Sequence, residues 1–310
     1  MKNKNILITG GLGFIGSHIV DTLMDDNKVT IIDNLSTGKI KNLNNPNHDN
    51  LEIIEKDLCE INLDEFTLNK DYIFHLAAMS SVPLSIKQPI KCNKINVTGT
   101  VKLLKSAVKN NVKKIVFSSS SAVYGENKNM PLKETEPLMP MSPYASSKAS
   151  CELYLKAFHE SYGLNYTALR YFNVFGSNQD KNSQYAAVIP NFISALLEGN
   201  QAIIYGDGEQ TRDFVHVSDI VKANIAACES SYNGVVNVAS GKKLSINRLY
   251  EIIKDCLDSD LEPEYLPERA GDIKHSLANI DNMQNINLKI DSANFESQLI
   301  ETIEWFKTIL

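Results

Sequence analysis

The chain has 310 residues, of which 43% are hydrophobic and 22% charged, a composition that is ordinary for a globular protein and unlike that of a disordered chain. With 31 Lys and Arg against 37 Asp and Glu, the net charge of −6 argues against nucleic acid or an anionic membrane surface as a partner. No apolar run is long enough to predict a membrane span, and five widely spaced cysteines indicate reduced thiols in a cytoplasmic protein without a metal site.

Short apolar runs alternate with longer segments of helical spacing in the first half of the sequence. Strands are predicted at 5–9, 29–33, 51–57, 72–77 and 112–118, and helices at 14–23 and 96–108. The runs Ile6-Leu7-Ile8 and Ile115-Val116-Phe117 are apolar on both faces, which is typical of parallel strands covered by helices. The pattern predicts an α/β fold with a doubly wound parallel sheet of the Rossmann type.

The second half begins with a proline-rich loop at 125–143 and becomes less regular after Gly176. Helices are predicted at 144–162, 190–197, 218–228, 246–257 and 294–310, and strands at 166–172, 202–205 and 235–238. We expect a nucleotide-binding domain at 1–175. A smaller mixed α/β portion at 176–310 is expected to bind the substrate and to return some segments to the first sheet.

Three glycines, Gly10, Gly13 and Gly16, join the first predicted strand to the first predicted helix with the spacing GxxGxxG. A dinucleotide site needs glycine for a tight turn, for close approach of the backbone to the pyrophosphate, and for close helix–strand packing. The N–H groups at the start of the helix can then bind the phosphates. A glycine-rich turn without a ligand is the simpler alternative, but the position of the loop after the first strand favours the dinucleotide site.

Asp33 ends the second predicted strand, 17 residues after Gly16. A carboxylate there can accept hydrogen bonds from both adenosine ribose hydroxyls and repels a 2′-phosphate, so NAD is favoured over NADP. The alternative is an aspartate that merely begins a turn. Asp57, at the end of the third predicted strand, is expected near the adenine.

Three pairs have the spacing YxxxK: Tyr124/Lys128, Tyr144/Lys148 and Tyr250/Lys254. The spacing occurs about once by chance in a chain of this composition, so the context has to separate the pairs. Tyr124 precedes the proline-rich loop, and Tyr250 lies among the apolar residues of a predicted helix. Tyr144 follows Pro143, which suits a helix start, and the helix places Lys148 one turn along on the same face.

The chemistry of a hydride-transfer site fits this pair. A free tyrosine has a pKa of about 10 and is a poor base at neutral pH. The Lys148 cation and a positively charged nicotinamide are expected to lower the pKa of Tyr144, which can then take a proton from a sugar hydroxyl. A serine from the run at 118–121, at the end of the fifth predicted strand, can hydrogen-bond the reacting oxygen, although serines at a strand end can equally form a turn.

Taken together, several motifs carry a family resemblance: the glycine loop, DNLSTG at 33–38, HLAA at 75–78, the serine run before VYG at 123–125, SPY with Lys148, and RYFNVFG at 170–176. The chain resembles the extended short-chain dehydrogenases/reductases over nearly its whole length, and within them the UDP-hexose 4-epimerases. The resemblance implies that Tyr144 is the catalytic base, Lys148 its partner and Ser120 the catalytic serine.

The resemblance also implies the contacts of both ligands. The implied NAD contacts are Gly10, Gly13, Phe14, Ile15, Gly16, Asp33, Asn34, Ser36, Thr37, Gly38, Asp57, Leu58, Leu76, Ala77, Ala78, Asn96, Tyr144, Lys148 and Tyr171. The implied UDP-hexose contacts are Ser81, Ser120, Tyr144, Asn173, Ala187, Val188, Asn191, Tyr205, Arg212, Arg269, Asp272 and Ser276. A homodimer is implied through the helices near 96–108 and 144–162.

Acidic groups distinguish the reactions that this fold supports. Sugar dehydratases resembling this chain have Asp-Glu after the catalytic hydroxyl and decarboxylases have a Glu, where this chain has Ser121 and Ala122. A site with only Tyr and Ser can oxidise a carbinol and reduce the ketone again, which predicts epimerisation at C4. The alternatives are a UDP-glucuronate 4-epimerase on the same machinery, or a non-catalytic NAD-binding regulator.

Ser276 bears on which sugars the substrate site can accept. Epimerases restricted to glucose and galactose resemble this stretch but carry a tyrosine at the position of Ser276, and a smaller residue leaves room for an acetamido group. The sequence therefore predicts interconversion of UDP-GlcNAc and UDP-GalNAc together with UDP-Glc and UDP-Gal. Arg212 and Arg269, two of four arginines, suit diphosphate binding, although a local salt bridge of Arg212 is an alternative.

Overall fold

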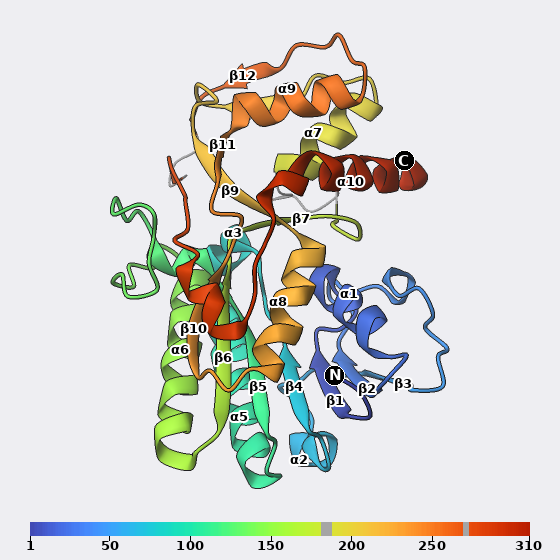
Figure 1. The fold of residues 1–310 in the computed structure, drawn as a ribbon, viewed down its shortest axis with the longest axis vertical. Helices are drawn as coiled ribbons and strands as arrows, with labels where there is room; N and C mark the ends of the chain where they lie inside the picture. Colours follow the sequence, from blue (N-terminus) through green and yellow to red (C-terminus); the bar gives the residue numbers. More distant parts are fainter. Residues whose placement is uncertain (181–187, 269–272) are drawn as a thin grey trace.

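A seven-stranded parallel sheet forms the centre of the computed structural model, which describes residues 1–180, 188–268 and 273–310 (Figure 1). Its strands are β1 (Asn5–Thr9), β2 (Lys28–Asp33), β3 (Leu51–Glu55), β4 (Tyr72–His75), β5 (Lys114–Ser120), β6 (Asn165–Tyr171) and β10 (Gly234–Val238). They follow the order β10-β6-β5-β4-β1-β2-β3. The order reverses between β1 and β4, and such a switch point is where ligands bind in open α/β sheets.

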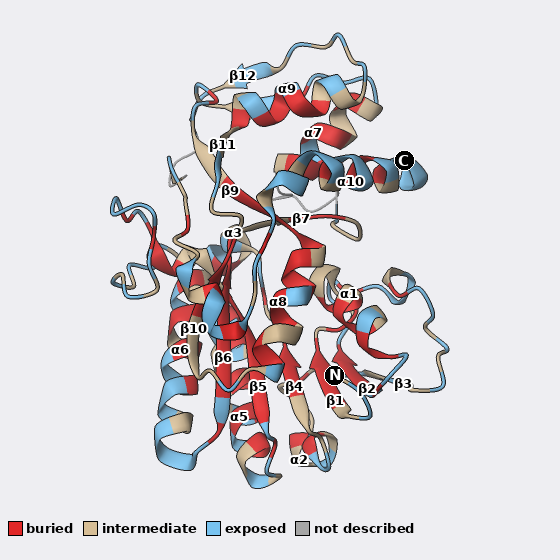
Figure 2. Ribbon diagram, in the orientation of Figure 1, coloured by how far each residue is buried: buried red, intermediate tan, exposed pale blue. Residues whose placement is uncertain are grey.

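Helices cover both faces of the sheet, because successive residues of each strand point to opposite sides. Ile6 and Ile8 pack with α1 (Phe14–Leu23) and α8 (Val217–Glu229). Leu7 belongs to the core on the other face, which is formed with α2 (Leu63–Thr67), α5 (Gly99–Lys109) and α6 (Pro143–Tyr162). Figure 2 shows the central strands β1, β4, β5 and β6 largely buried, whereas β3 at the edge is half-buried to exposed. The predicted doubly wound α/β fold is confirmed.

A second body stands above the ends of these strands in Figure 1. Its sheets contain β7 (Asn173–Phe175), β9 (Thr211–His216) and β11 (Lys243–Ser245), and β8 (Ile203–Tyr205) with β12 (Glu264–Leu266). Its helices are α7 (Val188–Leu197), α9 (Ile246–Cys256) and α10 (Phe295–Ile309). Phe192, Leu249 and Leu299, one from each helix, are buried in a core of their own.

The structure differs from the predicted elements chiefly around the helix expected at 96–108. This region contains α4 (Pro89–Asn93), a π turn (Lys94–Thr98) and α5, preceded by α3 (Val82–Lys87). Short 3-10 turns were also not predicted: Ile40–Asn42, Ser121–Tyr124, Asp281–Ile286 and Ser292–Asn294. These elements are too short to show a hydrophobic period in the sequence. They depend on local caps instead, as at α3, where the Ser81 side chain accepts a hydrogen bond from Leu84 N–H.

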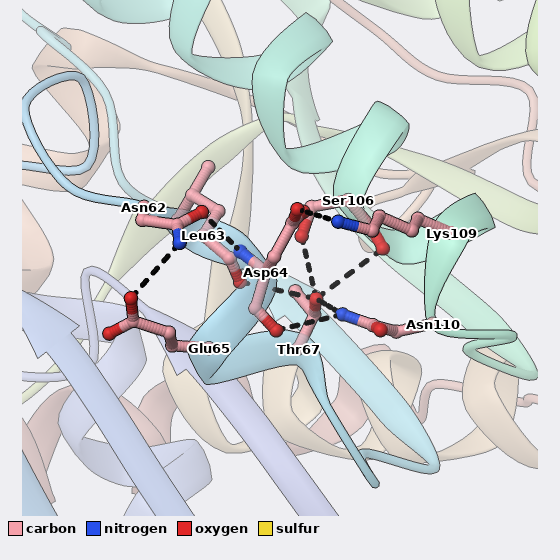
Figure 3. A network of polar contacts seen from close by, with 8 residues as sticks. All are labelled: Asn62, Leu63, Asp64, Glu65, Thr67, Ser106, Lys109 and Asn110. Carbon is pink, nitrogen blue, oxygen red and sulfur yellow. Dashed lines mark hydrogen bonds and ion pairs between the residues drawn. The ribbon is translucent and has the colours of Figure 1, made fainter.

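Polar contacts hold α2 against α5 (Figure 3). Both helices reach the end of the sheet opposite the second body (Figure 1). The Thr67 and Ser106 hydroxyls lie 2.6 Å apart, and Asn110 Nδ2 donates to Thr67 Oγ1 at 2.7 Å and to the Asp64 carbonyl at 2.8 Å. These contacts fix α5, whose other end carries the π turn. Within the described residues, no helix has the length and apolarity of a membrane span, and no cluster of His, Cys, Asp or Glu could hold a metal ion.

Candidate active site

The loop between β1 and α1 is shaped for a close backbone approach. Gly10 has φ +72°, and a Cβ on it would lie 2.7 Å from the Ala77 nitrogen. A Cβ on Gly16 would lie 2.1 Å from the Gly10 carbonyl oxygen, so neither position accepts a side chain. Gly13 is the N-cap of α1 and makes no side-chain cap. The cradle fits the pyrophosphate of a dinucleotide, because the start of the helix is open to an anion.

Two aspartates gather at the carboxyl ends of β2 and β3. Asp33 is 8% exposed, and its carboxylate accepts hydrogen bonds from Leu12 N–H at 3.1 Å and Leu35 N–H at 2.9 Å. A Cβ on Gly38 would lie 2.9 Å from both carboxylate oxygens of Asp33, so the 33–38 loop wraps closely around it. Asn34 Nδ2 donates to Asp57 at 3.1 Å. The arrangement fits an adenosine whose ribose faces Asp33.

Asn96 lies in the π turn and joins three segments. Its Oδ1 accepts from Met79 N–H at 2.8 Å, while its Nδ2 donates to the Met79 carbonyl at 3.1 Å and to Ser147 Oγ at 2.8 Å. The loop after β4, with Leu76, Ala77 and Ala78, is thereby tied to α6. A π turn inside a helix often marks a functional site.

His75 is a buried residue whose position sequence reasoning noted only as part of HLAA. Thr100 Oγ1 donates to the Asn96 carbonyl at 2.5 Å, so it must accept from His75 Nε2 at 2.8 Å. The other ring nitrogen, Nδ1, then accepts from Thr9 Oγ1 at 2.6 Å, and Thr9 Oγ1 accepts from Ala77 N–H. These partners assign the neutral Nε2–H tautomer, which connects the end of β1 to the π turn.

Acid should destabilise the protein through His75, because burial, aided by the charge of Lys148, lowers its pKa to about 3. The unfolded state, with a pKa of about 6.5, binds the proton first, so stability falls as the pH drops below that value. Between pH 7 and pH 5 the free energy of unfolding should lose about 2 kcal/mol through this group. Urea unfolding at both pH values measures it. A His75→Asn variant should lack this component, and an equal pH dependence in both proteins would contradict the assignment.

Ser120, Tyr144 and Lys148 converge at the carboxyl end of β5. Lys148 Nζ donates to the Ser118 carbonyl at 2.7 Å, lies 5.9 Å from the centre of the Tyr144 ring and 4.8 Å from that of Phe117. The Ser120 side chain lies near the Tyr144 phenol and acts to lower its pKa. Ser142 caps α6 by accepting from Ala145 N–H at 3.1 Å, which fixes the helix start that carries Tyr144.

The electrostatics of this trio differ from expectation. Burial lowers the pKa of Lys148 to about 8. Burial also raises the pKa of Tyr144, and the nearby Ser120 side chain offsets only part of that rise. In the protein without cofactor Lys148 therefore does not lower the pKa of Tyr144, and the expected lowering by Lys148 and a nicotinamide together stays a prediction for the complex with NAD. The physical reason is that the lysine ammonium is directed at the Ser118 carbonyl, while the phenol is withdrawn from water.

The other two YxxxK tyrosines are engaged in packing. Tyr124 donates to Asn237 Oδ1 at 2.6 Å, and burial raises its pKa to about 12. Tyr250 donates to the Leu261 carbonyl at 2.7 Å from the core side of α9. Tyr171, expected at the cofactor, has its hydroxyl in a buried network, 3.0 Å from Ser118 Oγ.

A cavity of about 480 Å³ lies between the two bodies. Of the predicted substrate contacts, it is lined by Asn173, Val188, Asn191, Tyr205 and Arg212, and of the predicted cofactor contacts by Phe14 and Ile15. Gln179 also lines it: its Nε2 donates to the Val174 carbonyl at 3.2 Å, and its Oε1 is buried without a partner among the described residues. The cavity thus opens from the glycine loop toward β8 and β9.

Ser276 lies beside this cavity and is not among the described residues that line it. Its N–H donates to the Thr211 carbonyl at 3.1 Å, and Thr211 N–H donates to the Lys274 carbonyl at 3.0 Å, so the segment runs along β9 next to Arg212. Arg212 Nη1 donates to the Lys274 carbonyl at 3.3 Å. Three predicted contacts, Ala187, Arg269 and Asp272, lie outside the described residues.

Sequence reasoning missed Asp213, the neighbour of Arg212 in β9. Its buried carboxylate accepts from Ser240 N–H at 2.8 Å, Gly241 N–H at 3.1 Å and Ala278 N–H at 3.2 Å. Burial raises its pKa to about 6 despite these bonds. Asp213 therefore holds the Ser276 segment against β9. The partners come from distant segments, and the only signal in the sequence was its position beside Arg212.

Comparisons with known proteins agree on one family. Residues 6–239 match the NAD dependent epimerase/dehydratase family. A UDP-N-acetylglucosamine 4-epimerase from Methanobrevibacter ruminantium M1, solved in complex with UDP-N-acetylmuramic acid, is 63% identical, with a TM-score of 0.99 and full coverage of both chains. A UDP-glucose 4-epimerase from Mycolicibacterium smegmatis is 37% identical over 87% of this chain and 88% of its own length. A UDP-N-acetyl-alpha-D-glucosaminuronate decarboxylase from Bacillus cytotoxicus is 35% identical over 99% and 98%.

Proposed function

Because the chain belongs to the NAD-dependent epimerase/dehydratase family, we propose that it interconverts the C4 epimers of UDP-hexoses, UDP-GlcNAc with UDP-GalNAc and UDP-Glc with UDP-Gal. The observation that carries the proposal is the meeting of Ser120, Tyr144 and Lys148 at the end of β5, beside the glycine loop. The cofactor is NAD, as in the family.

Tyr144 acts as the base that takes the proton of the sugar 4-hydroxyl, and Ser120 hydrogen-bonds the same oxygen. When bound, NAD would accept the C4 hydride and bring a positive ring that favours the phenolate. Lys148 keeps a positive charge close to the phenol. After the 4-keto sugar turns over, the hydride would return to the opposite face of C4 and Tyr144 would return the proton, so the product is the C4 epimer without net redox change.

The loop after the catalytic serine favours epimerisation over elimination or decarboxylation. Ser121 and Ala122 begin a 3-10 turn there, and Ser120 Oγ accepts from Ala122 N–H at 3.2 Å. Neither residue can act as the additional acid or base that loss of water requires. This separates the chain from its decarboxylase relative, which shares the fold.

The cavity provides the nucleotide site. Arg212 presents a guanidinium, which suits a diphosphate, and Asn173 and Asn191 add amides. Arg269 and Asp272 are proposed as further UDP contacts on the resemblance alone. We assign the NAD-binding and catalytic part to 1–175 and the sugar-nucleotide part mainly to 176–310, with β10 and α8 returning to the first sheet.

An acetamido group fits the polar groups at this site. The buried Oε1 of Gln179 is an acceptor on the cavity wall, where an acetamido N–H could satisfy it. Ser276 leaves more room beside β9 than a tyrosine would. We therefore propose that the N-acetylated sugars are substrates together with the simple hexoses.

Purified protein incubated separately with UDP-GlcNAc, UDP-Glc and UDP-GlcA tests the function, with C4 inversion followed by NMR. We expect inversion of the first two. Faster turnover of UDP-GlcA would favour a UDP-glucuronate 4-epimerase, and no turnover of any sugar would favour a non-catalytic NAD-binding regulator.

We also propose a homodimer, because apolar side chains lie exposed on adjacent helices: Ile90 of α4 is 85% exposed and Leu153 of α6 is 62% exposed. Sedimentation equilibrium should give twice the mass of 34.5 kDa. A cytoplasmic location is proposed from the free cysteines, which suit a reducing compartment.

A further inference from the structure

A buried ion pair lies one helical turn beyond the catalytic lysine. Glu152 follows Lys148 by four residues on α6, and its two oxygens accept from Arg170 Nε at 2.9 Å and Nη2 at 2.6 Å. The side chains are 4% and 3% exposed. The bidentate geometry is that of a strong charge-assisted pair.

Ser119 links this pair to the strand that carries the catalytic groups. Its hydroxyl donates to Glu152 Oε1 at 2.5 Å. Its neighbours in β5 are Ser118, whose carbonyl accepts from Lys148, and Ser120, the partner of Tyr144. Because side chains alternate along a strand, Ser119 points to the face of the sheet that α6 covers, and the ion pair ties the strand end to the helix that carries Tyr144 and Lys148.

Arg170 extends the anchor to the loop beside the site. Its Nη1 donates to the Glu134 carbonyl at 3.2 Å, and its guanidinium lies 4.6 Å from the centre of the Tyr124 ring. Glu134 in turn accepts from Asn237 N–H at 2.8 Å. One pair therefore joins α6, β5, β6 and the loop that follows the catalytic serine.

Titratable groups surround Lys148, and in the described residues they are His75 from β4, Cys92 from α4, and Tyr144, Cys151 and Glu152 from α6. The pKa values of both thiols and of Tyr144 are raised and that of His75 is lowered, so these four are neutral at pH 7. Glu152 is engaged in its ion pair with Arg170, so these two charges largely compensate each other near Lys148.

Stability alone is a weak reason for a protein to keep such a pair. A protein in which hydrophobic residues of similar volume replace a buried ion pair is often equally stable. Resting on the proposed function, we propose that Glu152, held by Arg170, is a positioning residue of the reaction: it fixes the 118–120 strand end against Tyr144 and Lys148.

Glu152→Gln alone leaves the Arg170 charge buried and unpaired and is expected to fold poorly. The informative protein is the double variant Glu152→Gln/Arg170→Met, which keeps an acceptor for Ser119 and leaves no lone charge. Its fold is checked by circular dichroism and by NAD retention. We expect kcat to fall about 10- to 100-fold with KM for the UDP-sugar nearly unchanged, because only the positioning of the reacting groups is lost.

The pH profile separates positioning from a structural role. The double variant loses a negative and a positive charge together, so the basic limb of kcat should stay in place while kcat falls, as expected when only positioning is lost. In Ser119→Ala the charges remain, and kcat should fall while the limb stays in place. The matched control, Asp71→Asn/Lys113→Met, removes an ion pair of 2.7 Å at the other end of β5. It should change neither kcat nor the position of the basic limb.

A folded double variant with the kcat of the wild type would overturn the proposal. A readout independent of turnover is hydrogen exchange at the amides of 118–120, which should become faster in the double variant and in Ser119→Ala. An inactive wild type with that change in exchange would refute the epimerase function and keep the positioning role of Glu152. Unchanged exchange in both variants would refute the role itself.

Discussion

Replacing Tyr144 with Phe should reduce kcat by about 100- to 10 000-fold, the range for loss of a general base, with KM for UDP-GlcNAc and NAD retention nearly unchanged. The backbone contacts of Tyr144 survive, since its N–H donates to Ser85 Oγ at 3.1 Å and its carbonyl accepts from Ser147 Oγ at 2.7 Å. The change therefore removes only the hydroxyl that faces Ser120. C4 inversion followed by NMR measures the loss.

Tyr250→Phe is the matched control, because this tyrosine has the same YxxxK spacing and also loses one hydrogen bond, to the Leu261 carbonyl. It should cost about 1 kcal/mol of stability and leave kcat unchanged. Full activity in Tyr144→Phe would refute Tyr144 as the base. Equal losses of kcat in both variants would indicate that the tyrosines of both YxxxK pairs serve packing and that neither is catalytic.

The raised pKa of Tyr144 in the protein alone has a consequence for this reaction. Neither the nearby Ser120 side chain nor Lys148 overcomes the cost of burying a phenolate. The proposed base would therefore become effective only in the complex with NAD, where a positive nicotinamide close to the phenol would favour the phenolate. Proton removal would then be coupled to the presence of the oxidised cofactor.

The first sheet could be predicted well from the sequence because its signals are local. Strands buried on both faces give unbroken apolar runs, as at 6–8 and 115–117, and Pro143 marks the start of the catalytic helix. Asp33 lies at the end of β2 as its position indicated. The π turn around Asn96 was not predicted, because its form depends on contacts with Met79 and Ser147 that are distant in sequence.

Contacts across the fold account for most of what sequence reasoning missed in the site. Glu152 was four residues from Lys148, yet its role depends on Arg170 and Ser119, which only the pairing of β5 with β6 brings together. Asp213 likewise gains its partners from turns far along the chain. Buried acids need several donors to be tolerated, and those donors cannot be deduced from a local pattern.

The substitution Ser276→Tyr should narrow the substrate specificity to sugars without an acetamido group. Turnover of UDP-GlcNAc should fall by about 100-fold or more, and turnover of UDP-Gal should stay within about threefold of the wild type, because steric exclusion acts on the added acetamido group alone. The backbone tolerates the change, since Ser276 is only half-buried and its N–H, which does not change, donates to the Thr211 carbonyl. Rates on both sugars, measured side by side, give the ratio.

Ser276→Ala is the control, because it keeps the small volume and removes the hydroxyl. It should retain turnover of both sugars, which would assign the effect of tyrosine to its size. Retained UDP-Gal activity in Ser276→Tyr shows at the same time that NAD, Tyr144 and the nucleotide site are intact. An equal loss on both sugars, or no loss on either, would place the selection of N-acetylated substrates elsewhere, and the buried Oε1 of Gln179 on the cavity wall is then the first candidate.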